Sequence, residues 1–118
     1  MTEGDNSINY VMAKAMAAGS YRELGNFAVA EEYLKDAYLR VAMEFGEDNV
    51  SAAVILNSMG LLYKKQGKLE RALDAYQRAL SVREAEFGED HPDCCATRHN
   101  IAEVYIQMVN PQKAQEYL

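Results

Sequence analysis

The sequence predicts an all-α fold, an open α–α superhelix in which antiparallel helix pairs recur about two and a half times. A shift of 42 positions superposes three stretches of the chain, so the sequence contains an internal repeat. The shift keeps two sets of residues in register: Tyr21, Tyr63 and Tyr105, and Ala30, Ala72 and Ala114. Each copy holds two runs with helical apolar spacing. Because one helix pair cannot bury both of its faces, successive pairs must stack on one another.

The central copy shows the two helices most clearly, at residues 50 to 66 and 69 to 87. In the first, Leu56, Met59, Leu62 and Tyr63 form one apolar stripe. Gly67 is suited to end this helix, because glycine readily adopts left-handed backbone. The second helix carries an apolar stripe of the same period: Leu69, Ala72, Leu73, Tyr76, Ala79 and Leu80.

The link to the third copy begins at Gly88, which ends the second helix of the central copy. We expect Asp90 to cap the following helix and Pro92 to occupy its first turn, where the missing N–H costs nothing. That helix is predicted over residues 92 to 108.

The first copy reads as the end of the stack. Residues 1 to 6 are expected to be flexible, with Asp5, Asn6 or Ser7 capping a helix that reaches about Leu24. Lys14 stands where the central copy has Leu56, which is typical of a more polar terminal repeat. From Asn26, a second helix carries an apolar stripe: Ala30, Leu34, Ala37, Val41 and Phe45.

The third copy is partial. Its turn reads Val109-Asn110-Pro111 where the central copy has Gly67-Lys68-Leu69, and we expect Asn110 to take the left-handed conformation. Leu118 lies about two turns into the last helix, so Ala114, Tyr117 and Leu118 begin a contact surface. Either the chain is a fragment of a longer array or another chain, including a second copy, covers this end. The domain then spans 7–118, with repeats at about 7–48, 49–90 and 91–118.

These positions resemble a known signature. Gly60, Tyr63, Gly67, Ala72, Tyr76 and Ala79 are similar to the tetratricopeptide repeat (TPR) pattern. The 42-residue period, with FGEDHPD after the second helix, resembles more narrowly the repeats of kinesin light chains. The resemblance implies a TPR solenoid that binds other proteins. It also implies that Asn57, and less securely Asn100, hydrogen-bond the main chain of an extended peptide.

Composition excludes several other classes of function. The net charge of −6 and the lack of any basic run longer than Lys64-Lys65 argue against nucleic-acid binding. No segment approaches the roughly 18 apolar residues of a membrane span. The N-terminus lacks the pattern of a signal peptide. We therefore expect a cytoplasmic protein, or a mitochondrial one if a targeting segment has been removed.

No constellation of side chains indicates catalysis or a cofactor. His91, Cys94, Cys95 and His99 lie close in sequence, and Cys95 with His99 has a spacing that suits two metal ligands on a helix. The favoured interpretation is that both cysteines are small packed residues, because they align with Ala52 and Ala53. We predict no metal, no cofactor and no enzymatic activity.

The predicted binding surface lies on the first helix of each repeat, on the concave side of the stack. Its strongest candidates are Arg22, Glu23, Asn57, Leu61, Lys64, Lys65, His99, Glu103 and Ile106, with Met12, Ala15, Gly19, Val54, Ala96 and Gln107 beside them. The basic members are expected to attract an acidic peptide. The leading hypothesis is an adaptor or scaffold that holds a partner's peptide or helix there. The alternative is a structural or assembly subunit that associates through Ala114, Tyr117 and Leu118, including self-association.

Overall fold

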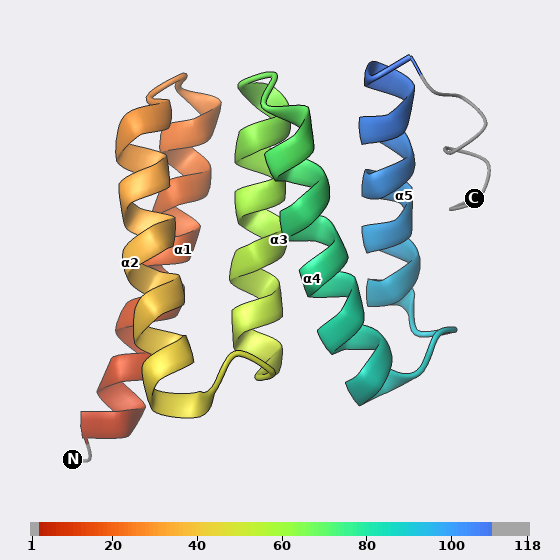
Figure 1. Ribbon diagram of the computed structural model, residues 1–118. Coiled ribbons are helices and arrows are strands. Elements are labelled where there is room, and N and C mark those ends of the chain that lie inside the picture. The colour runs from red at the N-terminus through yellow and green to blue at the C-terminus, as the bar shows by residue number, and fades with distance from the viewer. Residues whose placement is uncertain (1–2, 110–118) are drawn as a thin grey trace.

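The computed structural model describes residues 3–109, and all regular structure in that range is α-helical. Five helices follow one another in chain order (Figure 1). They are α1 (Glu3–Glu23), α2 (Phe27–Phe45), α3 (Val50–Lys65), α4 (Leu69–Phe87) and α5 (Pro92–Gln107). The molecule measures 51 × 34 × 19 Å. Its smallest dimension corresponds to two layers of helices, each about 10 Å thick.

The helices pack as a sequential array of antiparallel pairs. α1 packs on α2 and α3 on α4, while α2 contacts α3 and α4 contacts α5 to join one pair to the next. Figure 1 shows α2 and α4 in front of α1 and α3, and both run from the top of the view to the bottom. The predicted all-α array of helix pairs is confirmed.

Two turns in register show how the repeat is built and where it changes. Gly25 and Gly67 close α1 and α3 with φ of +81° and +77°, a conformation that L-residues rarely adopt. The equivalent residue after α5 is Val109, with φ of +60°. The left-handed residue was predicted at Asn110, which lies outside the described residues. Val109, in register with Gly67, adopts this conformation despite its β-branched side chain.

The apolar stripes form the core, and the stripe of α2 illustrates it. Ala30, Leu34, Ala37 and Val41 are all at most 2% exposed. Phe45, predicted to continue this stripe, is 45% exposed, because it occupies the final residue of α2, just before the turn at Gly46.

The tightest contact within a helix pair joins α3 to α4. A methyl group added at Gly60 would lie 2.6 Å from Cε1 of Tyr76, so the ring packs directly on the backbone of α3. Tyr76 is fully buried. Only glycine allows the ring to approach so closely. This explains why Gly60 stands in the middle of α3, although glycine in a helix interior costs about 1 kcal/mol relative to alanine.

Two predicted helix caps are wrong. α1 begins at Glu3, so the backbone at Asp5, Asn6 and Ser7 is already helical, whereas an N-cap must lie outside the helix. At α5 the N-cap is His91 and not Asp90. Pro92 occupies the first helical position and thereby makes the preceding residue the cap, and His91 Nδ1 accepts a hydrogen bond from the Asp93 amide at 3.1 Å.

The outer face of the first pair is polar, as Lys14 predicted. Lys14 Nζ lies 2.8 Å from Asp36 Oδ2, and Arg40 Nε lies 3.2 Å from the same oxygen. The Lys14 ammonium also lies 5.0 Å from the ring centroid of Tyr33. Because of the Lys14 ammonium, the pKa of Asp36 is below its usual value.

Candidate functional site

The predicted binding surface forms one side of the array, which we call the first-helix face. α1, α3 and α5 contribute these residues to it: Met12, Met16, Gly19, Arg22, Glu23, Val54, Asn57, Leu61, Lys64, Lys65, Ala96, His99, Asn100, Glu103, Ile106 and Gln107. Each helix repeats the geometry of its predecessor at an offset of 42 residues. Side chains far apart in sequence therefore lie beside one another on this face.

Polar side chains join α3 to α5 across the first-helix face. Lys64 Nζ lies 3.3 Å from Glu103 Oε2, and His99 Nε2 lies 3.0 Å from the other oxygen of that carboxylate. Asn100 Nδ2 donates a hydrogen bond to Asn57 Oδ1 at 3.4 Å. The two asparagines singled out for peptide binding are thus neighbours, and each retains hydrogen-bonding capacity for another polar group.

A second set of charges joins α1 to α3. Arg22 Nη2 lies 3.3 Å from Glu23 Oε1, and Lys65 Nζ lies 3.8 Å from the same oxygen. Together with Lys64, these are the cations expected to attract an acidic peptide. Each already has a carboxylate of the first-helix face within 4 Å, so its positive field is locally compensated.

Exposed apolar side chains accompany these charges. Ile106 is 56% exposed, while Leu61 is half-buried against the core beneath it. Met16 is 76% exposed and was missed, although shifting Asn100 back by two repeats leads to it. Ala15 was expected on this surface but is buried, because it packs in the core between α1 and its neighbours.

Tyr76 lies in the core beneath the charged side chains of the first-helix face. Its hydroxyl is buried and has no hydrogen-bond partner among the described residues. Burial raises the pKa of Tyr76 far above its usual value, and the Glu103 carboxylate adds to this while Arg22 opposes it. The core of the second helix pair therefore lies close enough to the first-helix face for the charges there to affect the pKa of a buried tyrosine.

The cysteines occupy different environments. Cys94 is buried, burial raises the pKa of its thiol, and its Sγ donates to the Gly88 carbonyl at 3.3 Å. Cys95 is exposed, so the interpretation that both cysteines pack is wrong for this one, because consecutive helical residues point in different directions. Among residues 3–109, no group of three His, Cys, Asp or Glu side chains is placed to hold a metal ion.

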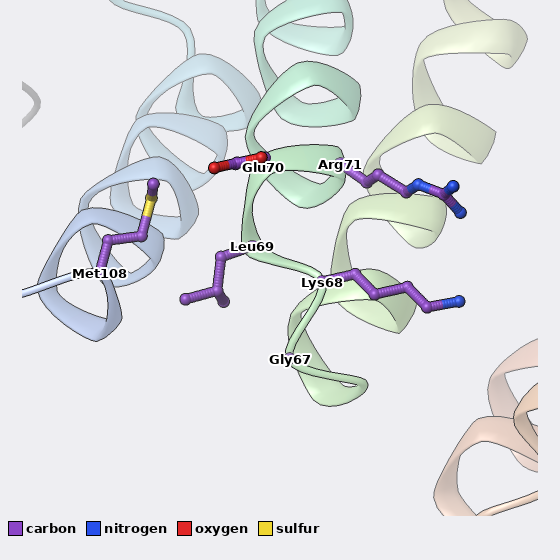
Figure 2. A pocket seen from close by; sticks show the side chains of 6 residues that line it. All are labelled: Gly67, Lys68, Leu69, Glu70, Arg71 and Met108. Atoms are coloured by element: carbon purple, nitrogen blue, oxygen red, sulfur yellow. The ribbon is translucent and has the colours of Figure 1, made fainter.

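A cavity of about 630 Å³ lies between the start of α4 and the end of α5. Figure 2 shows Leu69, at the start of α4, with its side chain on the side of Met108 at the end of α5, whereas Lys68 and Arg71 point the other way, toward α3. None of the predicted binding residues lines it. The predicted contact residues Ala114, Tyr117 and Leu118 lie outside the described part of the chain.

The helices described between residues 3 and 109 include none with the length and apolar character needed to cross a bilayer.

Comparison with known proteins identifies the repeats. The profile of the tetratricopeptide repeat family matches residues 10–85 and, in a second overlapping match, residues 51–118. Human nephrocystin-3 is 38% identical over 63 residues, which are 52% of this chain and 5% of that protein. Protein KINESIN LIGHT CHAIN-RELATED 2 of Arabidopsis thaliana is 27% identical over 95 residues, 80% of this chain and 14% of that protein. The chain thus spans only a small part of these relatives.

Solved structures agree with this relationship. The crystal structure of BtubC (BKLC) from P. vanneervenii superposes with a TM-score of 0.84 at 28% identity, covering 92% of this chain and 43% of that one. The TPR-like repeats of a putative kinesin light chain of Podosopora anserina share the fold, with a TM-score of 0.83 at 18% identity over 93% of this chain and 52% of that one. The predicted kinesin-light-chain-like character is therefore confirmed, and the chain belongs to the tetratricopeptide repeat family.

Proposed function

We propose that this chain is a non-enzymatic interaction module, an adaptor or scaffold, that holds a peptide or helix of a partner protein against its first-helix face. TPR domains are generally protein–protein interaction modules, which supports binding over catalysis. The partner is a protein, and the acidic net charge of −6 argues against nucleic acid.

The observation that carries this proposal is the continuity of the first-helix face across three helices. The Lys65–Glu23 pair connects α1 to α3, and the Lys64–Glu103 and Asn57–Asn100 pairs connect α3 to α5. Exposed apolar side chains at Met16 and Ile106 lie on the same side. A surface that combines polar groups with exposed apolar ones is suited to a polypeptide, whose main chain needs hydrogen bonds and whose side chains need apolar contacts.

The proposal is tested by removing two groups from the centre of the face. In the double variant Asn57→Ala with Lys64→Glu, we expect the proteins retained from a native extract by the wild-type chain to be lost. Glu86→Lys on the exposed side of α4 is the control and should retain them. Thermal unfolding establishes that all three proteins are folded. Equal retention by the double variant and the wild type would refute the assignment of the face.

The alternative is association through the C-terminal end, including self-association. The cavity beside Leu69 and Met108 lies at the end of the described chain and favours this possibility. Sedimentation velocity separates the two proposals. A concentration-dependent dimer that Leu69→Glu abolishes supports association at this end, whereas a monomer at high concentration argues against it.

A further inference from the structure

The cations of the first-helix face are largely covered by carboxylates. Only 14% of the Lys64 side chain is exposed, and Glu103 Oε2 lies 3.3 Å from its Nζ. Arg22 is similar, since 18% of its side chain is exposed and Glu23 Oε1 lies 3.3 Å from its Nη2. Each glutamate side chain is more exposed than the cation that it holds. A partner therefore meets these two positive charges only together with the carboxylates that compensate them.

Lys65 is the most exposed of the three cations, and it is also compensated. Its Nζ lies 3.8 Å from Glu23 Oε1, the oxygen that Arg22 contacts. The cations and the carboxylates together leave the face close to neutral, whereas the whole chain has a net charge of −6. A carboxylate of an acidic partner would have to displace Glu23 or Glu103. Such an exchange replaces one solvent-exposed ion pair by another, so it contributes little to affinity.

Apolar side chains on the same face offer a contact that does not depend on charge. Met16 of α1 is 76% exposed, and Ile106 of α5 is 56% exposed. Leu61 of α3, the helix between these two, is half-buried against the core. Removing apolar surface from water is favourable in proportion to its area. A partner that covers Met16 and Ile106 is therefore stabilised by these two contacts.

We propose that the segment bound by the first-helix face is uncharged and carries two apolar residues, one over Met16 and one over Ile106, in place of the acidic segment expected from the sequence. This inference rests on the function proposed for the face. Figure 1 shows α3 between α1 and α5, so the two apolar contacts are two helix spacings apart, about 20 Å. About seven residues of extended chain cover this distance. Glu23 and Glu103 determine the specificity, because they neutralise the cations that would otherwise favour acidic segments.

The experiment selects random peptides of about seven residues, displayed on phage, for binding to the immobilised chain. For the wild type, we expect the enriched sequences to have a net charge near zero and apolar residues toward both ends. Synthetic copies of these peptides should bind with an affinity that changes less than about twofold between about 50 and about 500 mM salt, because salt screens interactions between exposed charges.

Two double variants test the apolar contacts. Met16→Ser with Ile106→Ser should weaken the binding of the enriched peptides about tenfold or more, because both apolar contacts are lost. Leu39→Ser with Met43→Ser is the matched control. These side chains lie on α2 and are exposed to a similar degree, at 58% and 85%, so the peptides should bind this variant with unchanged affinity. Thermal unfolding establishes that both variants are folded.

A third double variant tests the role of the carboxylates. Glu23→Gln with Glu103→Gln leaves the three cations without their partners on the face. Selection against this variant should enrich acidic peptides, and their affinity should fall as the salt concentration rises. This result would also show that the library contains acidic sequences able to bind the face.

Three outcomes would overturn the inference: enrichment of acidic peptides by the wild type, equal binding of the enriched peptides to the wild type and to Met16→Ser with Ile106→Ser, or no acidic peptides enriched by the glutamine variant. If the wild type enriches acidic peptides and Asn57→Ala with Lys64→Glu abolishes their binding, this inference fails and the function proposed for the face stands. A wild type that enriches no peptide contradicts both.

Discussion

The junctions between successive helix pairs use the same positions with opposite chemistry. Where α2 meets α3, Val41 and Ile55 are fully buried in one apolar cluster. At the equivalent positions where α4 meets α5, Arg83 and Thr97 are buried, and Arg83 Nη1 donates to Thr97 Oγ1 at 2.7 Å. Equivalent positions are therefore buried in both junctions, but their side chains are apolar in one and polar in the other. The polar pair is accommodated because a hydrogen bond replaces the apolar contact.

The first and second helix pairs also differ in the sizes of the core side chains that face each other. Ala18 and Leu34 are both buried in the core of the first pair, and Gly60 and Tyr76 take their places in the second. A smaller residue on one helix thus accompanies a larger one on its partner. Packing density in protein interiors is high enough that neither change is tolerated alone.

The largest expected effect comes from Gly60→Ala. The new methyl group would lie 2.6 Å from the Tyr76 ring, whose position is fixed by the core, so overpacking should exceed the gain in helix propensity. We expect a loss of about 2 kcal/mol in the free energy of unfolding, measured by urea denaturation. Adding Tyr76→Leu recreates the first pair and should recover much of this loss. If the double variant instead loses as much stability as the two single variants added together, the two positions are not coupled.

The second effect concerns the polar junction. Thr97→Val removes the acceptor of the buried Arg83 guanidinium, whose Nε already has no partner among the described residues. We expect a cost of about 1.5 kcal/mol, again by urea denaturation. The double variant Arg83→Met with Thr97→Val resembles the apolar junction and should be more stable than Thr97→Val alone. If the double variant is the less stable, the guanidinium stabilises the junction by other contacts.

The caps of α3 and α5 give a smaller, matched comparison. Asn49 Oδ1 accepts from the Ser51 amide at 2.7 Å, and His91 Nδ1 accepts from the Asp93 amide at 3.1 Å. Asn49→Ala should cost about 1 kcal/mol, and His91→Ala less, because its hydrogen bond is longer. Thermal unfolding of the two variants measures the difference. A larger loss for His91→Ala would mean that its stacking on Phe87, at 4.3 Å between ring centroids, outweighs the cap.

The smallest effect involves the polar outer face of the first pair. Lys14 lowers the pKa of Asp36 in the folded chain, so the pair contributes stability at neutral pH and loses it as the pH falls through this lowered pKa. Asp36→Asn should be less stable than the wild type by under about 1 kcal/mol near neutral pH. The difference should begin to shrink as the pH falls below about 4, where an unpaired aspartate protonates, and should disappear once the pH is below the lowered pKa of Asp36. A difference that persists unchanged in acid would exclude the ion pair as its cause.

The array is well predicted because the repeat presents the first-helix positions three times and most second-helix positions twice. The helix predicted at 69 to 87 agrees with α4, and Gly67 and Pro92 have their predicted roles. The buried contact between Arg83 and Thr97 was not predicted, because arginine and threonine in a helix are usually exposed. Their burial depends on a contact between residues on different helices.

The binding surface was predicted in part, for a related reason. The offset of 42 residues identifies residues that share the first-helix face, but not the side-chain conformations that pair Lys64 with Glu103. The offset also does not predict the cavity between α2 and α4, where Lys35 of one repeat lies beside Arg71 and Asp74 of the next. Surfaces formed between copies require the packing of the copies to be known.

Site-specific photo-crosslinking tests the central claim most directly. A photoreactive amino acid is placed at Leu61 on the first-helix face, and in a second protein at Ala85, which is exposed on α4 and is not part of that face. We predict that a partner protein captured from extract is crosslinked from position 61 and not from position 85. Crosslinking from position 85 alone would contradict the account.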